Sequence, residues 1–345
     1  MPTMRQPKAS PGMSHKRAPP DQELRMNMTI QSLPADSKFN IPKAAYAALA
    51  IVAVTVIAGL TTPTFATVDN LFVVIRAASI TGIVAIGMSY ITISGNLFAL
   101  SASSLGALLA VLFALITSHL GFGTGIVLTL LIAAVAGVAQ GLAVNLIGNP
   151  IITTLAFGTV FRGLAALFSG NSILRIDSNA ALLLGTARPL GVPTQSWVFL
   201  LAALISWFII RHVKLGREIV LCGANKETAT ASGLNVGLVT VVACVALSVG
   251  VAIMGILTVS QFSQAKADLF MGYDFDYIAA VLVGGVALRG GRGSPIQAAL
   301  GAVLIALLQN FMLLNGYSAG LRMTIVGLLV IVSISVFHVL QGKSR

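Results

Sequence analysis

Apolar residues form long blocks along most of the chain, separated by short loops. Ten blocks can be distinguished, at residues 44–60, 77–96, 97–120, 124–147, 151–168, 195–210, 238–262, 277–288, 295–314 and 323–340. Most have close to the length of about 20 apolar residues with which a helix crosses a bilayer. The pattern predicts an all-α polytopic membrane protein with about ten transmembrane helices.

Three blocks depart from this regular pattern. The second block adjoins the third with only Gly95 and Asn96, the last two residues of the second, to mark the boundary, and the fifth block contains Arg162. The eighth block has twelve residues, about 18 Å as a helix against a hydrocarbon core of about 30 Å. It therefore either takes residues from its flanks or forms a broken or re-entrant helix. We expect no acidic residue in the middle of a span, with Asp274 and Asp276 in a loop before the eighth block.

The composition supports a membrane protein. Of 345 residues, 57% are hydrophobic and 9% are charged, whereas a soluble domain carries about 25% charged residues. So few charges cannot cover a water-facing surface, which excludes a soluble enzyme, a secreted disulfide scaffold and a disordered protein. Two cysteines, Cys222 and Cys244, indicate neither a disulfide framework nor a metal site.

Residues 1–43 differ from the transmembrane domain, which we expect at 44–340. They are rich in Pro, Ser, Lys and Arg and contain no apolar run, which predicts a disordered basic tail. They are not a signal peptide, because the first apolar block begins too late. Residues 341–345 would form a short C-terminal segment.

Positively charged residues are distributed unevenly between the two sides. With the tail in the cytoplasm and ten alternating spans, 15 of the 21 Lys and Arg residues lie inside and three lie outside, at Arg175, Arg188 and Lys266. Lys and Arg accumulate in cytoplasmic segments of membrane proteins. This split indicates that both termini are cytoplasmic. The net charge of +11 is accordingly explained by topology, and nucleic-acid binding is the weaker interpretation.

No catalytic, metal or cofactor constellation is visible. The four histidines lack metal-like spacing, and no complete phosphate-binding loop is present. The many small residues in the blocks predict close helix packing. Uncharged polar side chains within the blocks predict either interhelical hydrogen bonds or a path for a sugar or polyol. The candidate pathway residues are Asn96, Phe98, Gln140, Asn145, Gln261 and Asn310.

The longest interior loop, 214–236, contains a segment that predicts a short helix. Asn225 could cap this helix and Gly233 could end it. Such a helix between two spans is either a docking element or an ordinary connection. The residues expected to couple it to a partner are Gly223, Asn225, Ala229, Ala231, Ser232 and Gly233.

Three motifs resemble bacterial ATP-binding cassette (ABC) importer permeases of the ribose/monosaccharide class. The loop motif runs from Gly216-Arg217 through Gly223-Ala224-Asn225 to Ala231-Ser232-Gly233-Leu234-Asn235-Val236. A second motif ends in Gly290-Gly291-Arg292-Gly293-Ser294, where glycines with positive φ would form a tight turn. A third begins at Asn149-Pro150. One departure concerns residues 93–101, where the family has an acidic residue and this chain has Phe98 and Ala99.

The resemblance implies a fold of the vitamin-B12-importer type (type II) with two inverted halves. The pairs Gln140/Asn145 and Gln309/Asn310 would be counterparts in those halves. It also implies an inner-membrane permease subunit, not an enzyme, that imports a monosaccharide or small polyol. Its partners would be a cytoplasmic ATPase that uses ATP, a periplasmic binding protein and a second permease subunit. The alternative is a secondary transporter or facilitator, which the lack of acidic residues within the spans disfavours.

Overall fold

The computed structural model describes residues 41–342; the basic tail expected at the N-terminus lies outside the described residues. Ten helices correspond to the ten apolar blocks. They are α2 (Ile41–Thr61), α3 (Val68–Ile93), α4 (Ala102–Leu120), α5 (Phe122–Ile147), α6 (Pro150–Ser169), α8 (Thr194–His212), α11 (Val236–Phe262), α12 (Tyr273–Val283), α13 (Pro295–Leu314) and α14 (Ala319–Gly342). Seven of these are long and apolar enough to cross a membrane, and α2 and α14 contribute shorter described apolar stretches. The prediction of an all-α polytopic membrane protein is confirmed.

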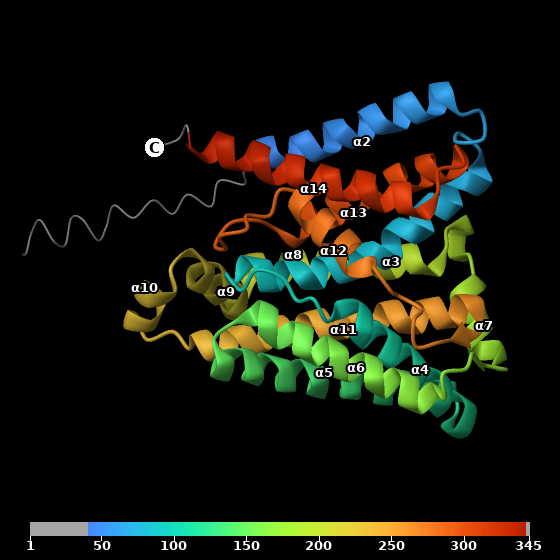
Figure 1. Ribbon diagram of the computed structural model, residues 1–345, viewed down its shortest axis with the longest axis horizontal. Coiled ribbons are helices and arrows are strands. Elements are labelled where there is room, and N and C mark those ends of the chain that lie inside the picture. Colours follow the sequence, from blue (N-terminus) through green and yellow to red (C-terminus); the bar gives the residue numbers. More distant parts are fainter. Residues whose placement is uncertain (1–40, 343–345) are drawn as a thin grey trace, which may run out of the picture. The chain divides into compact units, whose positions relative to one another are not determined.

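Short elements gather at the two ends of the helices (Figure 1). One end carries α9 (Lys214–Ala224) and α10 (Lys226–Ala231), and we call it the junction end. The other end carries α7 (Asn179–Thr186), a 3-10 turn (Pro189–Gly191) and two short strands, β1 (Leu174–Arg175) and β2 (Gln264–Ala265). We call it the strand end. The two strands pair antiparallel, with Leu174 opposite Ala265.

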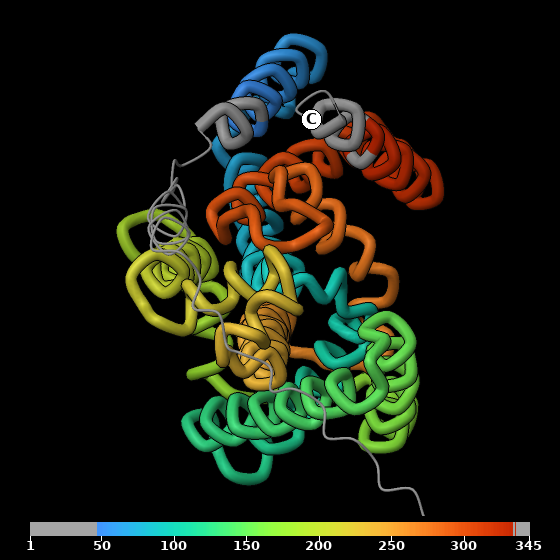
Figure 2. The backbone as a smooth tube through the Cα atoms, turned by 90° about the vertical axis from the view of Figure 1, so that its left-hand side faces the viewer, coloured from blue at the N-terminus to red at the C-terminus, as the bar shows by residue number. Residues whose placement is uncertain are grey.

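Helix α11 is the central packing element, in contact with α3, α4, α5 and α7. Figure 2, which looks along the helices, shows α11 between α3 and α5. Small residues allow this close approach, as the sequence predicts. A Cβ atom added at Gly87 would lie 2.8 Å from Leu247 Cα, and one added at Gly137 would lie 2.7 Å from Val245 Cα. Backbones that pack so closely exclude any larger side chain.

The boundary between the second and third blocks is a longer break than the sequence predicts. Helix α3 ends at Ile93 and α4 begins only at Ala102, so residues 94–101 are not helical. Gly95 has a φ of 80° and Leu97 a φ of 57°, both in the left-handed region that a right-handed helix cannot contain. The expectation that two residues separate two adjoining helices is therefore wrong.

The eighth block shifts toward its N-terminal flank without becoming longer, because α12 has 11 residues and the chain is not helical again until α13 begins at Pro295. Helix α12 begins at Tyr273, so Asp274 and Asp276 lie in its first turn and not in a loop, which corrects the sequence-based placement. Both carboxylates have partners inside the protein. Asp274 accepts hydrogen bonds from the backbone N–H and the hydroxyl of Ser103 in α4, and Asp276 accepts one from Gln309 in α13 (2.7 Å). These partners make two acidic residues tolerable within the helical core.

Two parts of the chain repeat the same arrangement with opposite direction. In each part a long helix, α3 or α11, is followed by an irregular segment and then by α4 or α12. Helices α3 and α11 are antiparallel, since Ile83 faces Gly250 and Gly87 faces Leu247. Gln140 of α5 donates to Ser101 at the start of α4 (2.7 Å), as Gln309 of α13 donates to Asp276 at the start of α12. This correspondence agrees with the inverted halves that the resemblance implies.

We expect Gly137→Leu to destabilise the protein, because its side chain would collide with the α11 backbone. Overpacking of this kind costs about 1–3 kcal/mol. Gly163→Leu in α6 is the matched control, since nothing lies within 4 Å of a Cβ atom at Gly163. The thermal unfolding midpoints of the purified proteins in detergent measure the difference. Equal midpoints for the two variants would show that the α5–α11 contact does not limit side-chain size.

Candidate functional site

Three segments far apart in the sequence meet at the junction end: the segment after α3, the α9–α10 connection and the turn between α12 and α13. The Gly291 N–H donates to the Ile93 carbonyl (2.8 Å). Lys226 Nζ donates to Asn96 Oδ1 (2.7 Å), and Asn96 Nδ2 donates to Thr240 of α11 (3.1 Å). We call this assembly the coupling junction. It connects the short helix α10 to the ends of two membrane helices, α3 and α11.

The short helix α10 has the caps that the sequence predicts. The Asn225 side chain accepts a hydrogen bond from the Thr228 N–H (3.0 Å), and Gly233 follows the helix with a φ of 79°. An N-cap of this type stabilises a helix end by about 1 kcal/mol. The two alanines named as candidate coupling residues differ in burial. Ala229 is 5% exposed, whereas Ala231 is exposed together with Ser232.

The turn at residues 290–294 also has the predicted backbone. Gly290, Gly291 and Gly293 have φ values of 77°, 68° and 137°. Ser294 caps α13 by accepting a hydrogen bond from the Ile296 N–H, and Gln297 completes a capping box with it. Close contacts also require glycine here, because a Cβ atom at Gly291 would lie 2.5 Å from Ala224 Cα. The side chain of Arg292 is exposed.

Positive charge surrounds the coupling junction. Among the described residues, the Lys and Arg residues of this end are Arg211, Lys214, Arg217, Lys226, Arg289 and Arg292. Burial lowers the pKa of Lys226, whose ammonium group reaches into the junction. Burial also raises the pKa of Cys222, with a smaller contribution from Glu218, so its thiol stays neutral near pH 7. At the junction, Lys226 is thus a partly buried cation whose ammonium group is held by Asn96.

The structure does not bring the candidate pathway residues together. Asn96 belongs to the coupling junction, and half-buried Phe98 lies in the irregular segment beyond it. Gln140 is bonded to Ser101, and Asn145 donates to the Gly237 carbonyl (2.8 Å). Gln261 accepts from Gln195, and Asn310 forms a reciprocal amide pair with Asn70 (2.8 and 3.0 Å). Each amide hydrogen-bonds to a partner in this chain, usually on another segment.

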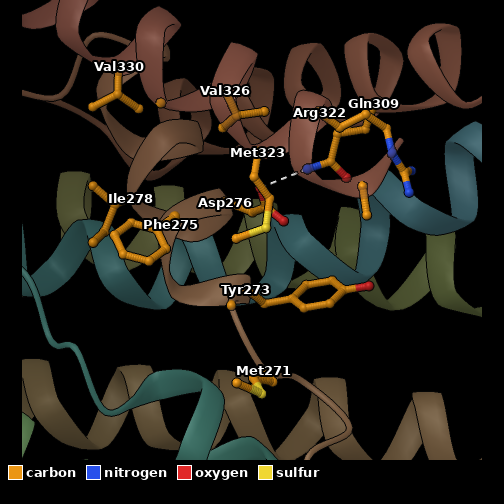
Figure 3. A pocket seen from close by; sticks show the side chains of 13 residues that line it. Met271, Tyr273, Phe275, Asp276, Ile278, Gln309, Arg322, Met323, Val326 and Val330 are labelled. Carbon is orange, nitrogen blue, oxygen red and sulfur yellow. Dashed lines mark hydrogen bonds between the residues drawn. The ribbon is translucent and has the colours of Figure 1, made fainter. Parts of the chain in front are cut away.

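A pocket of about 530 Å³ lies between α12, α13 and α14, and sequence reasoning missed it. Asp276, Gln309 and Arg322 contribute its polar groups, beside the aromatic rings of Tyr273 and Phe275 (Figure 3). The eighth block held the signal that could have revealed it. Asp276 directly precedes that block, so a helix that starts a few residues earlier includes this carboxylate in its first turn.

The family follows from comparison of the sequence with known proteins. Residues 70–334 match the family described as branched-chain amino acid transport system / permease component. The chain belongs to this family. The ribose import permease protein RbsC of Escherichia coli (strain K12) is 29% identical over 301 residues, covering 84% of this chain and 91% of that protein.

Other relatives cover similar shares of the chain. RbsC of Bacillus subtilis (strain 168) is 28% identical over 81% of this chain and 88% of its own length. The L-arabinose transport system permease protein AraH of E. coli (strain K12) is 29% identical over 87% of this chain and 92% of its own length. No solved structure gives a match.

We expect Gly291→Val to impair assembly of the coupling junction. Valine at a positive φ is strained by about 1–3 kcal/mol, and its side chain would also collide with Ala224. Arg292→Lys is the matched control, because it keeps an exposed positive charge one residue away. The amount of folded protein in the membrane and its unfolding midpoint measure the effect. A Gly291→Val protein with a normal yield and midpoint would contradict the proposed backbone role of this turn.

Proposed function

We propose that this protein is the membrane-spanning permease subunit of an ATP-driven importer for a monosaccharide or small polyol. The coupling junction is the observation that carries this proposal. It presents a short capped helix with exposed Ala231 and Ser232, and it links this helix to the transmembrane core. Family membership supports a transport subunit, and relatives named for ribose and L-arabinose support a sugar as the substrate.

In this proposal the ATPase is a separate cytoplasmic partner that binds at α10. ATP is bound and hydrolysed by that partner, and this chain carries no catalytic site of its own. Movement of α10 reaches the end of α3 through the bond from Lys226 to Asn96. It reaches the turn before α13 through the neighbouring end of α9, where Ala224 lies against Gly291. A displacement of the short helix is thus transmitted to two membrane helices at once.

The remaining partners follow from the orientation that we propose. The junction end faces the cytoplasmic side of the bacterial inner membrane. The strand end therefore faces the periplasm and receives a substrate-binding protein. A second permease subunit, identical or not, completes the pathway. A secondary transporter is the competing function. It binds no ATPase, so it does not require an exposed, capped helix packed against the ends of its spans.

The orientation predicts which surface residues each side can label. Ser232 follows α10 and Ser172 follows α6, and both are exposed at opposite ends of the protein. We expect Ser232→Cys to react with a membrane-impermeant thiol reagent only from the cytoplasmic side, and Ser172→Cys only from the periplasmic side. Right-side-out and inside-out vesicles give the two measurements. Reaction of Ser172→Cys from the cytoplasm would show that the orientation is opposite to the one proposed.

Docking at α10 predicts a loss of partner binding when its exposed face is enlarged. Ala231→Trp places a bulky ring where the ATPase would fit, and overpacking a fitted contact costs about 1–3 kcal/mol. We expect co-purification of the ATPase and sugar uptake to fall about 5- to 100-fold, with normal insertion and folding. Ala229→Trp is a poorer test, because Ala229 is buried in this chain and its enlargement would disturb the fold.

Ser172→Trp at the strand end is the matched control, since it adds the same side chain at an exposed position far from α10. It should leave ATPase binding unchanged. If Ala231→Trp also binds the ATPase and takes up substrate like the wild type, α10 is an ordinary connection. A wild-type protein that takes up sugar without any ATPase would favour the secondary transporter.

A further inference from the structure

We infer that the pocket between α12, α13 and α14 is a water-accessible binding site for a neutral, polyhydroxylated molecule of monosaccharide size. This inference rests on the proposed function and locates the substrate within it. The pocket is separate from the coupling junction, and the sequence analysis named two of its lining residues, Asp276 and Gln309, without placing either in a pocket.

The polar groups of the pocket come from three helices. Gln309 Nε2 of α13 donates to Asp276 Oδ1 of α12 (2.7 Å), and Figure 3 shows this bond at the pocket wall. Among the described residues, no donor within hydrogen-bond distance reaches the second carboxylate oxygen of Asp276. Arg322 of α14 also lines the pocket, and its buried Nε has no hydrogen-bond partner in the described part of the chain. Both charged groups therefore retain capacity for a ligand.

Lipid is a poor occupant for this pocket. Asp276 lies in the first turn of α12 and Arg322 in the first turn of α14, and charged groups within membrane helices face water or protein. A third charge lies next to the pocket, because exposed Arg162 of α6 donates to the sulfur of the lining residue Met271 (3.3 Å). Three ionisable side chains from three helices on one side of the bundle indicate that this side borders an aqueous path and not acyl chains.

The chemistry of the wall selects the class of ligand. One carboxylate and one guanidinium balance each other, so the pocket has no net charge that would favour an ion. The carboxylate accepts hydrogen bonds, the guanidinium donates them, and hydroxyl groups can do both. Tyr273 and Phe275 add aromatic surface for the C–H faces of a sugar ring. A volume of about 530 Å³ lies within the range of about 300–1,000 Å³ that small-molecule sites occupy.

Uptake measurements test the ligand. Asp276→Asn keeps an acceptor for Gln309 but removes the charge, and Arg322→Gln removes the guanidinium. Hydrogen bonds to charged groups are strong enough that we expect each change to lower the initial uptake of radiolabelled sugar about 10-fold or more. The probes are D-ribose, L-arabinose, D-xylose, D-galactose and myo-inositol. Asp268→Asn is the matched control, since Asp268 is an exposed carboxylate in the preceding loop.

A second measurement reports on water in the pocket independently of transport. In a protein with Cys222 and Cys244 replaced by Ala, Met323→Cys places a thiol in the pocket wall. We expect a charged, water-soluble methanethiosulfonate to label it in membrane vesicles. Val135→Cys on the exposed side of α5 should stay unlabelled, because that surface is apolar.

The outcomes separate this inference from the proposed function. Normal uptake by both pocket variants, or an unlabelled Met323→Cys, would overturn the pocket assignment while leaving the importer intact. A wild type that couples to its ATPase but takes up none of the five probes would show that the ligand class is wrong. A wild type without any ATPase partner would refute the proposed function, and labelling of Met323→Cys would then still decide whether the pocket is wet.

Discussion

Hydrocarbon offers no hydrogen-bond partners, and the other features of this structure depend on that constraint. A chain can leave the helical conformation inside a membrane only where protein replaces the missing partners. The segment at residues 94–101 meets this condition. The Leu100 N–H donates to Thr154 of α6 (3.1 Å), Thr92 donates to the Leu97 carbonyl (2.9 Å), and the amide of Asn96 is bonded on both sides. Helices α6 and α11 thus permit the break that lets α4 begin at Ala102.

The sequence predicts the features of this fold that local chemistry decides. Apolar blocks of sufficient length gave the helices, Asn225 gave the cap of α10, and the glycines at residues 290–293 gave positive φ. The sequence does not predict features that distant partners decide. Residues 97–100 are apolar and suit a helix, yet tertiary bonds hold them irregular. Asp274 and Asp276 suit a loop, yet partners 171 and 33 residues away place them inside a helix.

The candidate site shows the same division. Each part of the coupling junction carries its own motif, but no pattern reveals that Ile93, Gly223 and Gly291 converge, because the contact is between backbones. The amide side chains form the hydrogen bonds within the chain that the sequence predicts, but they do not lie together along one path. Because an unpaired amide is costly in lipid, most of them pair with a second segment, as Asn70 does with Asn310. Asp276 and Arg322, two charged residues of the pocket, lie within helices, where the sequence did not lead us to expect charge.

The central position of α11 has a consequence for how the protein is made. The small-residue faces of α3 and α5 fit a helix that the ribosome has not yet produced when they enter the membrane. Gly141 precedes the end of α11 by roughly 120 residues, and at about 5–20 residues per second that interval lasts roughly 6–24 s. During this time α3, α4 and α5 lack their contacts with α11. Biogenesis of this subunit therefore depends on whatever shields those grooved surfaces until α11 arrives.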